Sequence, residues 1–138
     1  MHQTNGICES FNSLMWHDSK LRGIRIRRRD DEIDDVVLDI EIRRTASELE
    51  HAPMTIVLED VAFFICDLDV QGKRECGDDV SSAKCSDQSE LKTKLQDERI
   101  ENSPNALKEH FHFHFYLIPP GGTVDVLAVG FRISGSAD

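Results

Sequence analysis

Long apolar runs are missing from this chain of 138 residues. No stretch approaches the roughly 20 apolar residues that a helix needs to span a bilayer. Residues 1–16 contain no basic segment followed by an apolar one, which is the pattern of a secretory signal. We therefore expect a cytoplasmic protein that is not inserted in a membrane.

Motifs that would identify a nucleotide-binding protein or a hydrolase are missing as well. The sequence contains no GxxxxGK[ST] or GxGxxG phosphate loop, and no GxSxG nucleophile elbow surrounds its serines. An enzyme is therefore the less favoured interpretation.

The sequence also lacks a CxxC pair. Without an export signal, we expect its cysteines to be free thiols rather than disulfides. Cys66 lies in an apolar stretch, which predicts a small buried side chain. The four cysteines are Cys8, Cys66, Cys76 and Cys85.

The chain has no excess of positive charge: 16 Lys and Arg face 26 Asp and Glu, so the net charge is −10. Binding to nucleic acid is unfavourable for such a chain, because neutralising phosphates requires a cationic surface. The cationic residues nevertheless cluster early, and they form either a solvated strand face or an anion- or RNA-binding patch. This cluster consists of Arg22, Arg25, Arg27, Arg28 and Arg29.

The sequence does contain several runs in which apolar and polar residues alternate, as in strands with one buried face. Such runs cover residues 21–28, 36–43 and 54–59, and a nearly continuous apolar run covers 63–70. The first two runs suit an antiparallel pair, in which Arg27 would face Glu41. Residues 1–10 show little periodicity and are expected to form a frayed terminus.

Residues 110–133 are predicted to form a hairpin, with its turn at Pro119-Pro120-Gly121-Gly122. Its second strand would run from residue 123 to 133. Its first strand would place aromatic and aliphatic groups on one face and polar rings on the other. The apolar set is Phe111, Phe113, Phe115 and Leu117, and the polar set is His110, His112, His114 and Tyr116.

Residues 71–105 are polar and rich in Gly, Ser and Asp, which predicts a mobile insertion. Asp87 and Glu90 have the spacing of a capping box, so a short helix should follow them. The whole chain, 1–138, is then a single domain with a β-rich α+β fold. We expect one curled antiparallel sheet of five or six strands with one or two short helices.

The residues with the clearest chemical potential are His110, His112 and His114. On a regular strand their imidazoles share one face, about 7 Å apart, and imidazole binds divalent transition metals. A further ligand would come from elsewhere in the chain. The alternatives are an incidental row of histidines on a polar sheet face, and pH sensing through repulsion between imidazolium groups. The candidate further ligands are His17, Asp18, His51, Asp39 and Glu41.

Trp16, His17 and Asp18 are the second candidate site, for binding a partner. His17 and Asp18 would form an acid–base pair or cap a turn, while Trp16 would fill one end of the core.

The stretch FNSLMWHDSKL, residues 11–21, resembles the opening of a group of small bacterial domains, some of them immunity-protein-like. They begin with a W/F-H-D-S/A-x-L box, which Trp16, His17, Asp18, Ser19 and Leu21 match, and a later F-x-x-V-like segment is matched by Val61, Phe63 and Phe64. The resemblance implies a small intracellular binding domain without catalytic activity.

Two functions follow from the sequence. The first is a non-catalytic cytoplasmic domain that binds a protein partner or a second copy of itself, consistent with its acidic charge. In that case no cofactor is expected. The second is a metal-binding protein or metal-dependent enzyme that uses the face of His110, His112 and His114.

Overall fold

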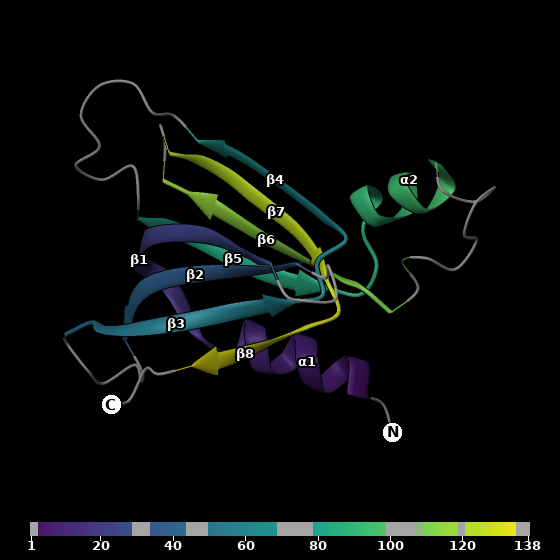
Figure 1. Ribbon diagram of the computed structural model, residues 1–138. Coiled ribbons are helices and arrows are strands. Elements are labelled where there is room, and N and C mark those ends of the chain that lie inside the picture. Colours follow the sequence, from purple (N-terminus) through teal and green to yellow (C-terminus); the bar gives the residue numbers. More distant parts are fainter. Residues whose placement is uncertain are drawn as a thin grey trace.

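A computed structural model describes most of the chain (Figure 1). The described residues are 3–28, 34–43, 50–68, 79–98, 107, 109–118 and 121–134. Within these ranges the chain forms two helices and eight strands. None of the helices described is both long enough and apolar enough to cross a membrane.

The strands form two antiparallel sheets of four strands each. Sheet A has the order β1 (Met15–Arg28), β2 (Asp34–Arg43), β3 (Ala52–Glu59), β8 (Gly130–Ser134). Sheet B has the order β4 (Phe63–Leu68), β7 (Gly122–Ala128), β6 (Phe111–Leu117), β5 (Val80–Ser86). The edge strands β1 and β5 approach each other through a bridge between Lys20 and Asp79. The helices are α1 (Gln3–Asn12) and α2 (Glu90–Glu98).

The β-rich antiparallel architecture with two short helices is confirmed, but the prediction of a single sheet is wrong. The chain changes sheet at two corners. Asp60, with a φ of 55°, lies between β3 and β4. Val129 divides the predicted 123–133 strand into β7 and β8, which belong to different sheets. The Val129 N–H donates to the carbonyl of Glu59 at 2.9 Å, so the two corners support each other.

Aromatic side chains fill the space between the sheets. Phe113 and Phe115 point inward from β6 and are almost fully buried. Phe11 of α1 packs against both, with ring-centroid distances of 5.0 Å and 5.7 Å. Trp16 joins the cluster at 4.7 Å from Phe11 and donates its Nε1–H to the Phe11 carbonyl. Burial of each large apolar side chain contributes about 2–3 kcal/mol, so this cluster is central to stability.

Helix α1 covers one end of the sandwich, where the sequence predicted a frayed terminus. Besides Phe11, its last residue fixes it in place. The Asn12 side chain accepts the N–H of Cys85 at 2.8 Å and donates to the carbonyl of Cys85 at 3.1 Å. Short helices depend on such tertiary contacts, because their nucleation is costly.

Strand β5 and helix α2 both lie inside residues 71–105. Helix α2 agrees with the expected short helix, although its N-terminus is capped by Ser89 rather than by Asp87. Strand β5 was not predicted, because only Val80 and Cys85 of its side chains are buried. An edge strand with one small apolar face gives too weak a pattern to detect.

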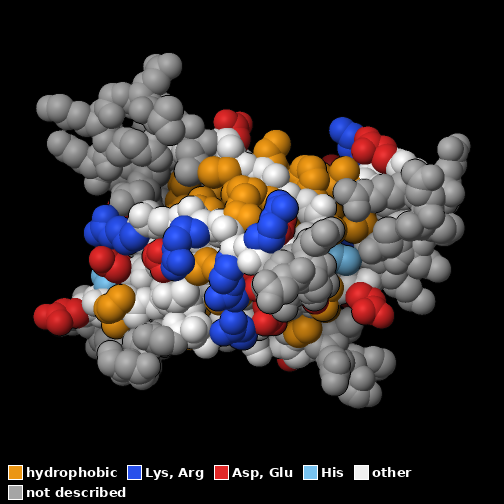
Figure 2. Space-filling model, viewed as in Figure 1, with side chains coloured by type: hydrophobic (Ala, Val, Ile, Leu, Met, Phe, Trp, Pro, Cys, Tyr) orange, Lys and Arg blue, Asp and Glu red, His pale blue; other side chains and the backbone are white. Residues whose placement is uncertain are grey.

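The arginines of β1 are held in ion pairs with the acidic side chains of β2. In Figure 2 blue and red side chains lie beside each other across the face turned to the viewer. The predicted pairing of Arg27 with Glu41 is wrong, because the register of β1 with β2 places Asp35 opposite Arg27 and Lys20 opposite Glu41. The ion pairs are Arg22–Glu41, Arg25–Asp39, Arg27–Asp35 and Arg28–Asp34. Arginines that are paired in this way favour a solvated strand face over an anion-binding patch. Arg29 lies outside the described residues.

One carboxylate of β2 is buried. Asp35 is 1 % exposed, and its Oδ2 lies 2.9 Å from the Arg27 guanidinium. Its Oδ1 accepts the backbone N–H of Asp60 at 3.1 Å. Asp35 therefore connects β1 to the corner at which the chain leaves sheet A.

We predict that Asp35→Ala lowers the free energy of unfolding by about 2–3 kcal/mol, because the Asp60 N–H loses its acceptor and Arg27 its partner. Urea unfolding followed by circular dichroism measures this. Glu59→Ala is the control, since Glu59 forms an exposed pair with Arg132 and should lose less than about 1 kcal/mol. Equal losses in the two variants would contradict the role of Asp35.

Candidate functional site: a cluster of two histidines and an aspartate

The outer face of sheet B carries the polar rings of β6. Because side chains alternate along a strand, the inward phenylalanines of β6 place His112 and His114 on the opposite face. The antiparallel register of β6 with β7 then brings Asp125 directly opposite His114. Three potential metal ligands thus come from two adjacent strands.

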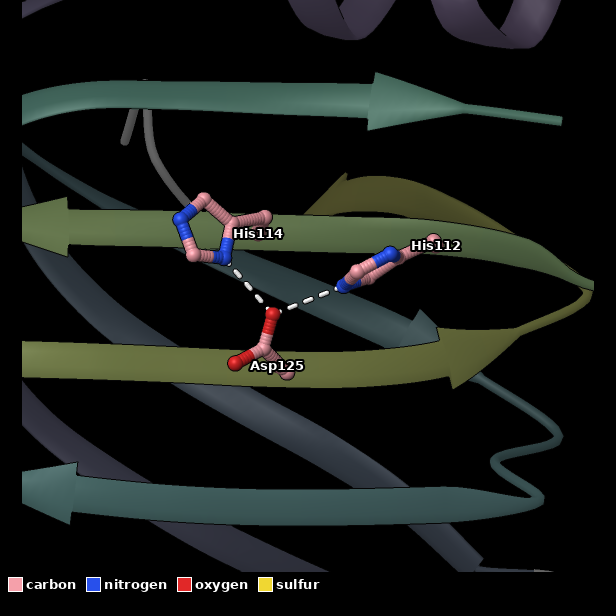
Figure 3. Close-up of side chains that lie close together, drawn as sticks. All are labelled: His112, His114 and Asp125. Atoms are coloured by element: carbon pink, nitrogen blue, oxygen red, sulfur yellow. Dashed lines mark hydrogen bonds and ion pairs between the residues drawn. The ribbon is translucent and has the colours of Figure 1, made fainter. Parts of the chain in front are cut away.

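The three side chains converge on one carboxylate oxygen (Figure 3). Asp125 Oδ1 lies 2.7 Å from His112 Nε2 and 2.6 Å from His114 Nδ1. The exposed fraction of the side chain is 13 % for His112, 18 % for Asp125 and 39 % for His114. The cluster is therefore well packed at His112 and open to solvent at His114.

His110, which the sequence placed in the same row, does not belong to this cluster. It precedes β6, and its backbone N–H donates to the carbonyl of Leu107 at 3.1 Å. Among the described residues, the ligand atoms that lie within 4.8 Å of one another are those of His112, His114 and Asp125. The structure thus brings together two of the three predicted histidines and adds an aspartate.

Asp125 was not among the predicted further ligands, all of which lie outside the predicted hairpin of residues 110–133. The hairpin itself contained the signal. A tight turn that pairs Leu117 with Gly122 necessarily pairs His114 with Asp125, three residues further on each side.

The other candidate ligands contact different groups. Asp39 binds Arg25, and Glu41 binds Arg22, whose guanidinium lowers the pKa of the Glu41 carboxyl below its usual value. His51 Nε2 lies 2.8 Å from the carbonyl oxygen of Asp18. These residues belong to sheet A or its surroundings, so they do not complete the histidine cluster on sheet B.

The second candidate site, Trp16, His17 and Asp18, lies in an irregular part of β1. Trp16 is only 4 % exposed and belongs to the core, which agrees with its predicted packing role. His17 and Asp18 are exposed, with 3.6 Å between His17 Nε2 and Asp18 Oδ1. His17 Nδ1 lies 3.2 Å from the carbonyl oxygen of Ser81 in β5. The structure therefore separates a buried tryptophan from an exposed polar pair.

The dimensions of the His112, His114 and Asp125 cluster suit a transition-metal ion. Ligands at the usual zinc distances of about 2.0–2.2 Å stand about 3.3–3.5 Å apart in a tetrahedral site. Because the two imidazole nitrogens lie 2.7 Å and 2.6 Å from Asp125 Oδ1, these contacts need to open by only about 0.7 Å.

One side chain from each of the flanking strands β4 and β5 lies next to the cluster. Across sheet B, Ile65 of β4 lies beside Asp125, and Lys84 of β5 lies beside His114. Lys84 is exposed and Ile65 is 49 % exposed. A cationic side chain therefore stands next to the more accessible imidazole.

Comparison of this chain with protein-family models, with curated proteins and with solved structures finds no match.

We predict that Asp125→Ala, in protein freed of metal by a chelator, lowers the free energy of unfolding by about 1–3 kcal/mol. The change removes Asp125 Oδ1, the acceptor that both imidazoles share. His112 Nε2, on a mostly buried ring, then loses this hydrogen bond. Urea unfolding provides the measurement. Asp39→Ala, which breaks an exposed pair with Arg25, should cost less than about 1 kcal/mol. If Asp125→Ala costs no more than Asp39→Ala, the cluster has no structural role.

Proposed function

We propose that this protein binds a divalent transition-metal ion through His112 Nε2, His114 Nδ1 and Asp125 Oδ1. The convergence of these three atoms to within 4.8 Å supports the proposal. Two imidazoles and one carboxylate suit zinc, iron and nickel, whereas calcium and magnesium prefer oxygen ligands alone.

Three protein ligands leave at least one coordination position open, as in catalytic rather than structural zinc sites. The exposed side of His114 is where water or a second molecule would approach. The exposed ammonium of Lys84, on the neighbouring strand, would attract an anionic group to that position. The proposed site therefore binds metal and presents it to a small anion or to a carboxylate of a partner.

Isothermal titration of the chelator-treated protein with zinc tests this proposal. We predict one equivalent bound by the unmodified chain. His112→Ala and Asp125→Ala should each weaken binding at least tenfold, because each removes a ligand.

His110→Ala is the matched control, since it removes a histidine of the same segment that lies outside the cluster. The zinc affinity of this variant should stay within about twofold of that of the unmodified chain. Absence of stoichiometric binding by the unmodified chain would refute the metal site. An affinity lost equally in His110→Ala would instead favour the three-histidine row.

A second function, binding of a protein partner, is favoured by a surface hollow where β1 and the start of β2 meet the corner that leads into β4. Ile26 of β1 is 59 % exposed and lines the hollow with Val61 and Phe64. In the view of Figure 2, hydrophobic side chains gather over the region of β4, β7 and β6. The resemblance of residues 11–21 to immunity-protein-like domains also supports this proposal.

We predict that the immobilised unmodified chain retains a specific protein from an extract of the native host, and that Ile26→Lys abolishes this retention. A charge would replace the apolar contact that a partner makes in the hollow. Ile133→Lys is the control, because Ile133 is a similarly exposed isoleucine, 43 %, on the edge strand β8. Retention of the same proteins by both variants would count against the hollow as a docking site.

A further inference from the structure

Two cysteine sulfurs from distant parts of the sequence lie in contact beneath α1. Cys8 Sγ of α1 is 3.3 Å from Cys85 Sγ of β5, across a separation of 77 residues. Both are free thiols in this structure. From this geometry we infer that Cys8 and Cys85 form a reversible disulfide that joins α1 to β5.

The backbone around the two sulfurs is already held in place. Asn12, one helical turn after Cys8, bonds both the N–H and the carbonyl of Cys85. A disulfide bond is about 2.05 Å long, so the sulfurs must approach by only about 1.2 Å. The hydrogen bonds of Asn12 keep the helix and the strand together in the reduced form, so the two sulfurs stay close to each other.

The two sulfurs differ in access. Cys8 is partly exposed, whereas Cys85 is 2 % exposed, so a reagent in solution reaches Cys8 first. Burial raises the pKa of both thiols above the ordinary value. The charged groups that face the Cys8 thiol are Asp87, which raises its pKa further, and Lys92, which lowers it. Near neutral pH both sulfurs are protonated, so exchange with a disulfide reagent is slow.

The reaction requires an oxidant of the disulfide class, for which glutathione disulfide serves. The Cys8 thiolate attacks one sulfur of glutathione disulfide, which forms a Cys8–glutathione bond and releases one glutathione. The Cys85 thiolate then attacks the Cys8 sulfur, which forms the Cys8–Cys85 bond and releases the second glutathione. The two thiol protons and two electrons of the protein end on the two glutathione molecules.

The disulfide would fix the helix that carries Phe11 into the core. A crosslink between residues 77 positions apart restricts the unfolded chain strongly, and the melting temperature should rise by about 10 °C. Oxidation would therefore convert a helix held by packing and hydrogen bonds into one that cannot detach.

The test uses the full chain with Cys66→Ser and Cys76→Ser, so that Cys8 and Cys85 are its remaining thiols. The protein is incubated with glutathione disulfide at mildly alkaline pH and then freed of reagent. Intact mass should fall by two hydrogen atoms, and a digest without reductant should contain the Cys8 peptide linked to the Cys85 peptide. The melting temperature should rise by about 10 °C and return after treatment with dithiothreitol.

Cys8→Ser in the same background is the control, and its melting temperature should not respond to the reagent. The unmodified chain provides an independent check, since its digest should show the same linked peptides. The inference is overturned if the oxidised protein carries only glutathione adducts or free thiols. It is also overturned if Cys8 or Cys85 of the unmodified chain links mainly to Cys66 or Cys76, or if the control gains equal stability.

Discussion

The alternation of phenylalanine and histidine along β6 is the constraint on which both the core and the candidate site depend. Phe113 and Phe115 must face inward to contact Phe11 and fill the space between the sheets. Because successive side chains point to opposite faces, their burial forces His112 and His114 outward. The packing that stabilises the fold therefore also fixes the orientation of two proposed metal ligands on a rigid strand.

The third ligand depends on the register of the β6–β7 hairpin. With Leu117 opposite Gly122, Asp125 lies opposite His114 and on the same outer face. A slip of one residue would turn Asp125 toward the core and bring a valine to the histidines. Gly122, with a φ of 112°, adopts at the start of β7 a backbone conformation that favours glycine. The turn and the site are thus parts of one structural unit.

Strict alternation made β2 and β6 predictable from sequence, whereas features that depend on tertiary contacts were not. The division into two sheets depends on corners at Asp60 and Val129, which no periodicity marks. Helix α1 is held by Phe11 and by bonds to β5, so its own sequence gives little signal. Cys66, predicted to be buried, is exposed on the edge strand β4. Two of the three side chains of the site followed from the histidine spacing, and the third, Asp125, required the register.

Anomalous diffraction at the zinc absorption edge, from crystals grown with zinc, tests the central claim most directly. The account predicts one strong peak on the outer face of sheet B, within about 2.0–2.2 Å of His112 Nε2, His114 Nδ1 and an Asp125 oxygen. A peak bound by His110, or zinc located only at His17, His51 or crystal contacts, would contradict it. The Asp125–histidine cluster would then be a hydrogen-bond network that stabilises the sheet.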